Sequence, residues 1–497
     1  MNYEYSRMTR RTALAVLGTS AVGLLPHSGP GVLAAPVVGA PRLYHEKFRP
    51  QFHFTARHGW INDPNGLVYV NGIYHLFFQY LPNSLNGNSG NKYWGHAISR
   101  DLIHWRQLQV AISPDKFGGI WSGSAAVDTH NTTGFQRGNN PPVVAMYTAA
   151  GGSSKISQGE PFAQCLAYSN DGGMTFVKYA HNPVLGQIVS GNRDPKIFWH
   201  APSHRWIVPL FLNADRGFAI LTSPDLISWH KTQELHFPQS QECPNLFPLA
   251  DPVSPQKQHW IFTAANGQYL IGDFNGTAFT PRSGPFAMDT GNSFYASQIF
   301  NDIPKKDGRT IQITWMRGGS YPGMPFNQQL GFPCTLVLQK SAGGLRIARW
   351  PVREIHHLWR AEHRLHNASV AHASHLLQTV ASDILDIEME IAVGNSREIA
   401  LTAGGVSIQW SAETGAIRCL GASGTAVPEN GRLALRLLLD RTSLELFVGG
   451  GLCSMSSCYL PKVGRGGSGL TANGRGARVT ALAIRELKSA WNDIPPA

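Results

Sequence analysis

The fold is indicated first by the stretch Gly66-Leu-Val-Tyr-Val-Asn-Gly-Ile-Tyr-His-Leu-Phe-Phe78. Two runs of apolar, β-branched and aromatic residues flank Asn71-Gly72 in it. Asn-Gly supplies the positive φ angles that a two-residue turn needs, so we expect a β-hairpin. Short apolar runs at Val143–Tyr147, Trp206–Phe211 and Trp260–Thr263 predict further strands, and the sequence shows no long helical periodicity there.

A short motif recurs between these runs. It occurs as Ser99-Arg-Asp101-Leu-Ile-His-Trp105, as Ser223-Pro-Asp225-Leu-Ile-Ser-Trp229 and, more loosely, as Ser169-Asn-Asp171-Gly-Gly-Met-Thr-Phe176. A Ser-x-Asp turn that recurs between strands and ends on an aromatic residue is typical of stacked four-stranded blades. The pattern therefore favours a β-propeller over residues 45–350, with a sandwich or barrel as the alternative.

The pattern changes after residue 350. Residues 351–375 hold six histidines among Arg, Glu and Leu, and their spacing matches no metal-binding motif. We therefore predict that they form a connecting segment. Alternation returns in 376–490, at Asp383–Ile391 and in the runs Leu433–Leu439 and Leu444–Val448, which predicts a β-sandwich domain.

Composition narrows the class of protein. The 497 residues are too many for a single domain of the usual ~150. Only 15% of the residues are charged, against ~25% in average soluble domains, and Gly (52), Pro (32) and Trp (13) are abundant. The net charge of +11 is scattered, so we expect no nucleic-acid partner and interpret the charge as a solubility property. Six cysteines form no CxxC pair, but Cys453 and Cys458 are close enough in sequence to bridge across a hairpin.

The first residues indicate a targeting signal. Arg10-Arg11 precedes an apolar run from Thr12 to Leu25, followed by small residues. This resembles a twin-arginine export signal, and the run is shorter than the ~20 residues that span a bilayer. We therefore predict that residues 1–40 are an export signal and leader, that the protein is secreted or periplasmic, and that it leaves the membrane once the signal is removed.

Three carboxylates stand out by their neighbours. Asp63 lies in Trp60-Ile-Asn-Asp-Pro-Asn-Gly66, Asp194 in Asn192-Arg-Asp-Pro195 and Glu242 in Gln241-Glu-Cys-Pro244. A proline within two positions makes each turn rigid, so the acid is held in place. The three are far apart in the chain, and propeller blades converge on one axis, so they can meet in one pocket.

Such a set of acids suits glycoside hydrolysis. A retaining glycosidase needs an ionised nucleophile and a protonated acid, with their carboxyl groups ~5–5.5 Å apart. Glu242 lies in an uncharged stretch that permits it to keep a proton, whereas Arg193 favours an ionised Asp194. The candidates for stacking on sugar rings are Trp60, Trp94, Trp121 and Trp315. The residues alone indicate a sugar hydrolase and leave the sugar open.

The motifs resemble those of glycoside hydrolase family 32, which contains invertases, inulinases and levanases. Trp60–Gly66 is similar to the family's WMNDPNG box, with Ile61 in place of Met, Arg193–Pro195 to its RDP box and Glu242–Pro244 to its ECP box. The supporting segments, in chain order, are Phe77–Tyr80, Trp94–His96, Trp121–Ser124, Ser293–Gln298 and Leu439–Phe447. One departure is that Asn83–Asn88 lacks the Trp that the family usually carries shortly after the first of these segments.

The resemblance implies an all-β fold, a five-bladed β-propeller followed by a β-sandwich, and retaining cleavage of fructosyl linkages with neither metal nor cofactor. Asp63 would be the nucleophile, Glu242 the acid/base, and Asp194 would stabilise the transition state by binding fructose hydroxyls. The residues expected to line the pocket are Asn62, Gln79, Trp121, Ser122, Arg193 and Trp315.

We therefore predict an exported hydrolase that releases fructose from levan or inulin. The alternatives are an invertase acting on sucrose, a fructosyltransferase with the same three acids, and a non-catalytic fructan-binding protein.

Overall fold

The computed structural model describes residues 43–213, 217–461 and 467–491. The predicted export signal and leader at 1–40 lie outside these ranges. The described chain is nearly all β, and its longest helix is α1 (Val370–Thr379). None of the described helices is long and apolar enough to cross a membrane.

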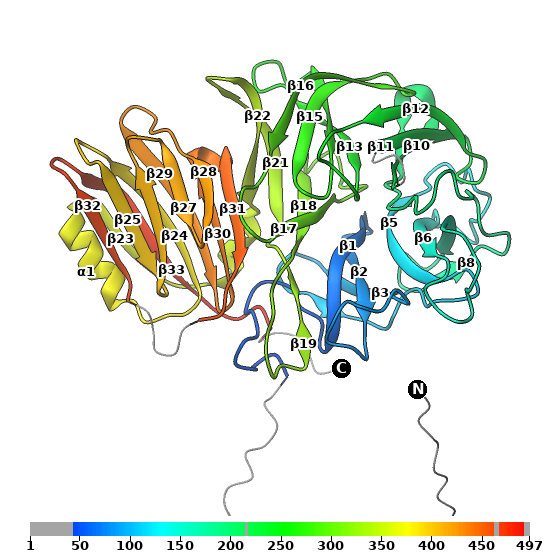
Figure 1. The fold of residues 1–497 in the computed structure, drawn as a ribbon, viewed down its shortest axis with the longest axis horizontal. Coiled ribbons are helices and arrows are strands. Elements are labelled where there is room, and N and C mark those ends of the chain that lie inside the picture. The colour runs from blue at the N-terminus through cyan, green and yellow to red at the C-terminus, as the bar shows by residue number, and fades with distance from the viewer. Residues whose placement is uncertain (1–42, 214–216, 462–466, 492–497) are drawn as a thin grey trace, which may run out of the picture. The chain divides into compact units, whose positions relative to one another are not determined.

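Five sheets follow one another between residues 59 and 351 (Figure 1). The first contains β1 (Gly59–Val70), β2 (Ile73–Leu81), β3 (Tyr93–Ser99), β4 (Arg106–Gln107) and β19 (Phe326–Asn327). The second contains β5 (Gly119–Val127), β6 (Val143–Ala150), β7 (Ala163–Ser169) and β8 (Val177–Lys178). The third contains β9 (Phe198–His200), β10 (Arg205–Leu212), β11 (Gly217–Ser223) and β12 (His230–His236). The fourth contains β13 (Asn245–Ala250), β14 (Gln258–Thr263), β15 (Gln268–Phe274) and β16 (Phe279–Ala287). The fifth contains β17 (Phe294–Ile299), β18 (Thr310–Met316), β20 (Gln329–Leu330), β21 (Cys334–Ser341) and β22 (Gly344–Pro351).

Recurrent turns organise three of these sheets. Asp101 and Asp225 each accept hydrogen bonds from the serine two residues before them and from two backbone N–H groups after them. Trp105 and Trp229 both donate their indole N–H to the carbonyl three residues earlier, at 2.9 Å. Asp171 forms a similar turn. The recurrent motif is thus one local structure, which joins β3 to β4, β7 to β8 and β11 to β12.

Buried polar side chains connect the first strands of the sheets. Gln298 on β17 accepts from the backbone of β1 and donates to that of β5. Ser124 on β5 donates to the carbonyl of Pro195, just before β9, and Asn245 on β13 donates to the backbone of β17. Because such buried groups need partners, these bonds fix how the first strands meet. All five sheets are therefore held together at one place.

Two further sheets follow. One contains β23 (Trp359–Ser369), β24 (Leu385–Ala392), β29 (Arg432–Asp440), β30 (Ser443–Val448), β31 (Cys453–Cys458) and β33 (Arg478–Leu487). The other contains β25 (Glu398–Ala403), β26 (Val406–Ser411), β27 (Ala416–Cys419), β28 (Ala422–Thr425) and β32 (Gly469–Asn473). Buried side chains from both sheets and from α1 form one apolar core.

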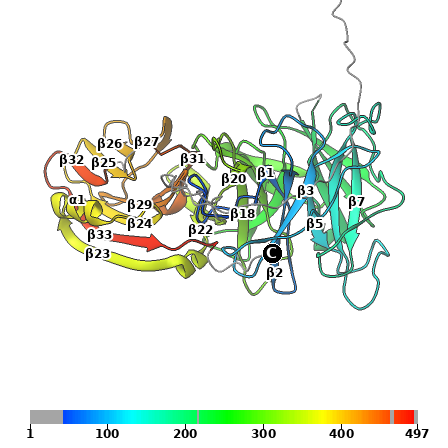
Figure 2. The same ribbon diagram turned by 90° about the horizontal axis from the view of Figure 1, so that it is seen from below.

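One expectation for this region was wrong. Residues 351–375 are more than a connecting segment, because they form a 3₁₀ helix (Arg353–Leu358), strand β23 and the start of α1. Figure 2 shows β23 alongside β33, with which it pairs. It is an edge strand whose side chains are mostly exposed or half-buried, so apolar alternation does not mark it in the sequence. Cys453 and Cys458 are both free thiols, because they occupy opposite ends of β31.

A buried charge cluster joins the N-terminal segment to both groups of sheets. The ring nitrogens of His53 lie 2.9 Å from Asp440 and 2.9 Å from Glu445. Asp440 also accepts from the backbone N–H groups of Gln51, Phe52 and His53, and Arg349 on β22 pairs with Glu445 at 2.8 Å. Although burial opposes the charged ring, the hydrogen bonds to Asp440 and Glu445 raise the pKa of His53 to about 9. The ring is therefore protonated at neutral pH.

Replacing Asp440 tests this cluster. Asp440→Ala removes one of the two acceptors of a buried imidazolium and leaves three backbone N–H groups without their acceptor, so we expect the free energy of unfolding to fall by roughly 3–5 kcal/mol. Asp273→Ala removes an exposed carboxylate, 2.6 Å from Arg282, and should change it by less than about 1 kcal/mol. Urea unfolding at pH 7 measures both, and equal losses would contradict the role of the cluster.

Candidate active site

The predicted catalytic residues and the residues that the family resemblance places at the substrate line one pocket of about 260 Å³. They are Asn62, Asp63, Gln79, Trp121, Ser122, Arg193, Asp194, Glu242 and Trp315. The three acids come from β1 and from the segments before β9 and β13. Segments distant in sequence thus deliver their carboxylates to one place.

The backbone that carries the acids is irregular. Asp63 lies at a break in the register between β1 and β2. Asp194, Glu242 and Cys243 have φ angles of 66°, 58° and 42°, in the left-handed region that non-glycine residues rarely adopt. The Asp194 N–H donates to Thr148, and Arg193 exchanges backbone hydrogen bonds with Phe211. The surrounding sheets therefore hold these residues in conformations that an isolated turn would avoid.

Asp63 is surrounded by donors. Ser122 donates to its Oδ2 at 2.6 Å, and Asn62 donates to its Oδ1 at 3.1 Å. Gln79 in turn donates to Ser122 at 3.1 Å. Burial raises the pKa of Asp63, whereas the bonds from Ser122 and Asn62 and the charge of Lys92 oppose the rise. Both carboxylate oxygens are thus oriented, and Gln79 and Ser122 act at least in part by orienting them.

Arg193, which we expected to pair with Asp194, pairs more closely with Glu242. Arg193 Nη2 lies 2.7 Å from Glu242 Oε1, whereas its Nε lies 3.9 Å from Asp194. Tyr295 donates a short hydrogen bond to the other oxygen of Glu242. The left-handed backbone at positions 194 and 242 turns the two side chains so that the sequence neighbour of Arg193 is not its closest partner.

Asp194 is the most deeply buried of the three acids. Its side chain is 6% exposed, and Cys243 N–H donates to it at 3.1 Å. Burial raises the pKa of Asp194 to about 7; Arg193 opposes this, and Glu242 and Asp63 add to it. Cys243 Sγ lies 3.6 Å from Asp63 and 3.7 Å from Asp194, and burial keeps it a thiol by raising its pKa. The two aspartates therefore share one neighbour.

Aromatic side chains form the walls. The ring centroids of Trp60 and Trp315 lie 6.5 Å apart, and Tyr295 and Trp315 form a similar edge contact. Trp121 also lines the pocket, but Trp94 is fully buried and supports it by donating to its carbonyl at 2.9 Å. Of the four tryptophans expected to stack on sugar, only Trp94 lies outside the pocket.

Comparison with known proteins identifies the family. The model of the Glycosyl hydrolases family 32 N-terminal domain matches residues 53–351, and that of the Glycosyl hydrolases family 32 C terminal matches 358–486. This chain belongs to glycosyl hydrolase family 32.

Relatives of this family 32 enzyme align over most of its length. A levanase from Bacillus subtilis (strain 168) is 34% identical over 499 residues, covering 91% of this chain and 72% of that protein. An extracellular exo-inulinase from Aspergillus ficuum is 30% identical over 527 residues, covering 90% and 96%. The crystal structure of exo-inulinase from Aspergillus awamori superposes with a TM-score of 0.79 at 26% identity, covering 90% of this chain and 100% of that one.

Sequence reasoning did not assign every residue of the pocket. Lys92, Tyr295 and Gly87 also line it. Tyr295 lies within a segment that resembled the family, but nothing around Lys92 in the sequence marks it as functional. Gly87 lies in the segment without the usual Trp, and a Cβ there would come within 2.9 Å of the Trp60 indole. The glycine therefore lets the loop pack against Trp60.

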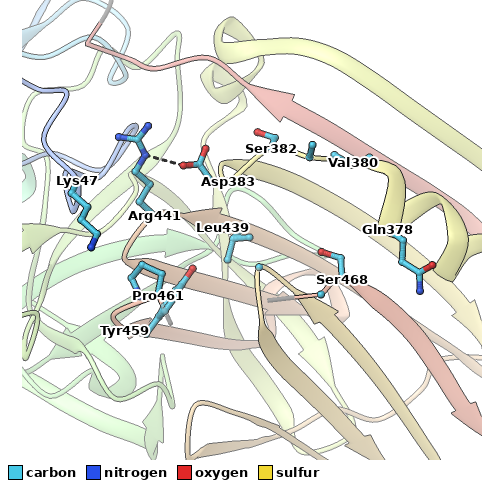
Figure 3. Close-up of a pocket in the computed structure, with 13 residues that line it drawn as sticks. Lys47, Gln378, Val380, Ser382, Asp383, Leu439, Arg441, Tyr459, Pro461 and Ser468 are labelled. Atoms are coloured by element: carbon cyan, nitrogen blue, oxygen red, sulfur yellow. Dashed lines mark hydrogen bonds and ion pairs between the residues drawn. The ribbon is translucent and has the colours of Figure 1, made fainter. Parts of the chain in front are cut away.

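A larger cavity lies elsewhere in the enzyme. Its volume is about 550 Å³. Figure 3 shows Asp383, Arg441 and Tyr459 among its lining residues. Asp383 is the only carboxylate among the described residues that line it, and it pairs with Arg441 at 3.0 Å. Because general acid–base chemistry on a glycoside needs a pair of acids, the smaller pocket is the candidate active site. No described residues form a group of three or more His, Cys, Asp or Glu suited to a metal ion.

Replacing Asp194 tests how its burial affects the stability of the enzyme. Its pKa of about 7 in the folded enzyme exceeds the ordinary 3.8, so the folded state binds more protons between these values and stability falls as pH rises from about 4 to 7. Asp194→Asn removes this dependence of stability on pH. We expect its free energy of unfolding at pH 8 to be about 1–3 kcal/mol higher than that of the parent. Urea unfolding at pH 5 and pH 8 tests this, with the exposed Asp273→Asn as control. A variant less stable than the parent at pH 8 would contradict the burial effect.

Proposed function

We propose that this enzyme is a retaining fructosidase that releases fructose from the β-fructosyl linkages of fructans such as levan or inulin. The observation that carries the proposal is the meeting of Asp63, Asp194 and Glu242 in one pocket with aromatic walls. The names of the relatives, levanase and exo-inulinase, support the choice of substrate. The volume of about 260 Å³ suits one sugar unit, which favours attack at chain ends.

In the first step Asp63 is the nucleophile. One of its oxygens attacks the anomeric carbon of the terminal fructosyl unit, and the bond to the leaving oxygen breaks as Glu242 gives that oxygen its proton. The product is a fructosyl ester of Asp63 and a shortened chain. The donors Ser122 and Asn62 support this role, because they hold the carboxylate and favour its ionised form.

In the second step Glu242 acts as a base. It takes a proton from water, whose oxygen attacks the anomeric carbon from the face that the chain has left, and Asp63 departs as a carboxylate. Two inversions give fructose with retained configuration. No step needs a metal or a cofactor.

Asp194 would bind fructose hydroxyls. In the free enzyme burial favours a proton on Asp194, whereas the reaction needs the proton on Glu242. Hydroxyl groups that donate to Asp194 favour its ionised form, so substrate binding would oppose the effect of burial on this carboxyl. Gln79 lines the pocket, and its Oε1 is buried without a hydrogen-bond partner among the described residues, so it offers an acceptor for a further hydroxyl.

The scaffold we propose is a five-bladed β-propeller over residues 45–350 and a β-sandwich that begins at β23 and ends near residue 490. The five successive sheets and the Ser-x-Asp turns support the blades. The single core between the last two sheets supports the sandwich. We further propose export through the twin-arginine-like signal at residues 1–40 to the periplasm or the medium, which the extracellular exo-inulinase among the relatives supports.

The products formed from levan, inulin and sucrose test the proposal. We expect free fructose from all three, with a higher kcat/KM for a fructan than for sucrose. Asp63→Ala should keep the fold and lose at least about a thousandfold in rate, because it removes the nucleophile. Asp273→Ala removes an exposed carboxylate and should keep full activity.

Four outcomes would contradict it. Faster cleavage of sucrose than of both fructans would indicate an invertase. Longer oligosaccharides in place of fructose would indicate a fructosyltransferase. Binding of levan with no product, or full activity in Asp63→Ala, would end the assignment of these acids.

A further inference from the structure

The pocket holds more acidic than basic side chains. Three carboxylates and two cations, Arg193 and Lys92, line it. Arg193 contacts Glu242 through both Nε and Nη2, at 3.2 and 2.7 Å. Arg193 also lies 3.9 Å from Asp194, so of the cations described there Lys92 is the one left to balance Asp63. Neither the sequence motifs nor the steps above give it a role.

Lys92 reaches Asp63 through Asn62. Its Nζ donates to Asn62 Oδ1 at 3.0 Å, and Trp60 Nε1 donates to the same oxygen at 3.3 Å. A lysine ammonium and an indole N–H can only donate, so together they require the amide oxygen to face them. The Asn62 NH₂ group must then face Asp63, to which it donates at 3.1 Å.

The position of Lys92 is itself fixed. Its carbonyl accepts from the N–H of Ile120 at 2.7 Å, which connects the segment before β3 to β5. Its Nζ lies 5.9 Å from the ring centroid of Trp121. The lysine is half-buried, so its charge is screened less by water than that of a surface lysine.

We propose that Lys92 is a positioning residue for the nucleophile: it orients the Asp63 carboxylate through Asn62 and keeps it ionised beside two other acids. This deepens the proposed function and rests on it. The charge matters because several groups that favour a neutral Asp63 share its pocket. The titratable or charged groups of the pocket that surround Asp63 are Lys92 before β3, Arg193 and Asp194 before β9, Glu242 and Cys243 before β13, and Tyr295 on β17.

The pH dependence of kcat/KM on inulin tests the proposal. Lys92→Met removes the charge and the donor but keeps an unbranched chain of similar length. Loss of a neighbouring positive charge raises the pKa of a carboxylate, so we expect the acid limb of the profile to move up by about one pH unit, together with a fall in kcat. Lys92→Arg restores the charge and should return the limb most of the way to its original position.

The matched control is Lys305→Met. Lys305 is exposed between β17 and β18, at the end of that strand pair opposite to Tyr295 and Trp315, and its loss should leave the profile unchanged. Should Lys92→Met fail to fold, Lys92→Gln serves for the same measurement.

An unchanged acid limb in the charge-removing variant would overturn the proposal, whether KM or thermal stability changes or not. So would an acid limb that Lys92→Arg leaves displaced as far as Lys92→Met does. Failure of the proposed function itself would be visible separately, because the parent enzyme would then release no fructose at any pH.

Discussion

The site depends on holding three carboxylates together away from water. Like charges in a small pocket repel one another and lose hydration, so each acid needs compensation from fixed groups. Arg193 and Tyr295 supply it for Glu242, Ser122 and Asn62 for Asp63, and the Cys243 N–H for Asp194. The compensation is incomplete, since the pKa of Asp194 still rises to about 7. Hydroxyl groups of a bound sugar that donate to Asp194 can supply the compensation that the protein leaves out.

The scaffold supplies the rigidity that this arrangement needs. Asp194 and Glu242 sit in left-handed backbone conformations, which persist only when the surroundings determine them. Side chains such as Gln298 and Asn245 join the first strands of the sheets near the pocket, and the His53 cluster ties those sheets to the C-terminal ones. Strain at the acids is therefore supported by hydrogen bonds that lie outside the pocket.

Local features are predictable from the sequence, and long-range partners are not. The Asn71-Gly72 hairpin and the Ser-x-Asp turns follow from short-range rules, and the three acids can be recognised by the residues on either side of them. The partner of Arg193 depends on backbone conformations at two distant turns, so its sequence neighbour is a misleading guide. Strand β23 carries no apolar alternation because it is an edge strand, and Lys92 acquires its neighbours only through folding.

The most direct measurement is to trap the covalent intermediate. In Glu242→Gln, an activated fructoside with a good leaving group can still react with the nucleophile, but no base remains to direct water onto the ester. Peptide mapping by mass spectrometry of the quenched variant should find one fructosyl unit on the peptide that contains Asp63. A fructosyl unit on the peptide that contains Asp194, or none on any peptide while the leaving group is released in excess of the enzyme, would contradict the account.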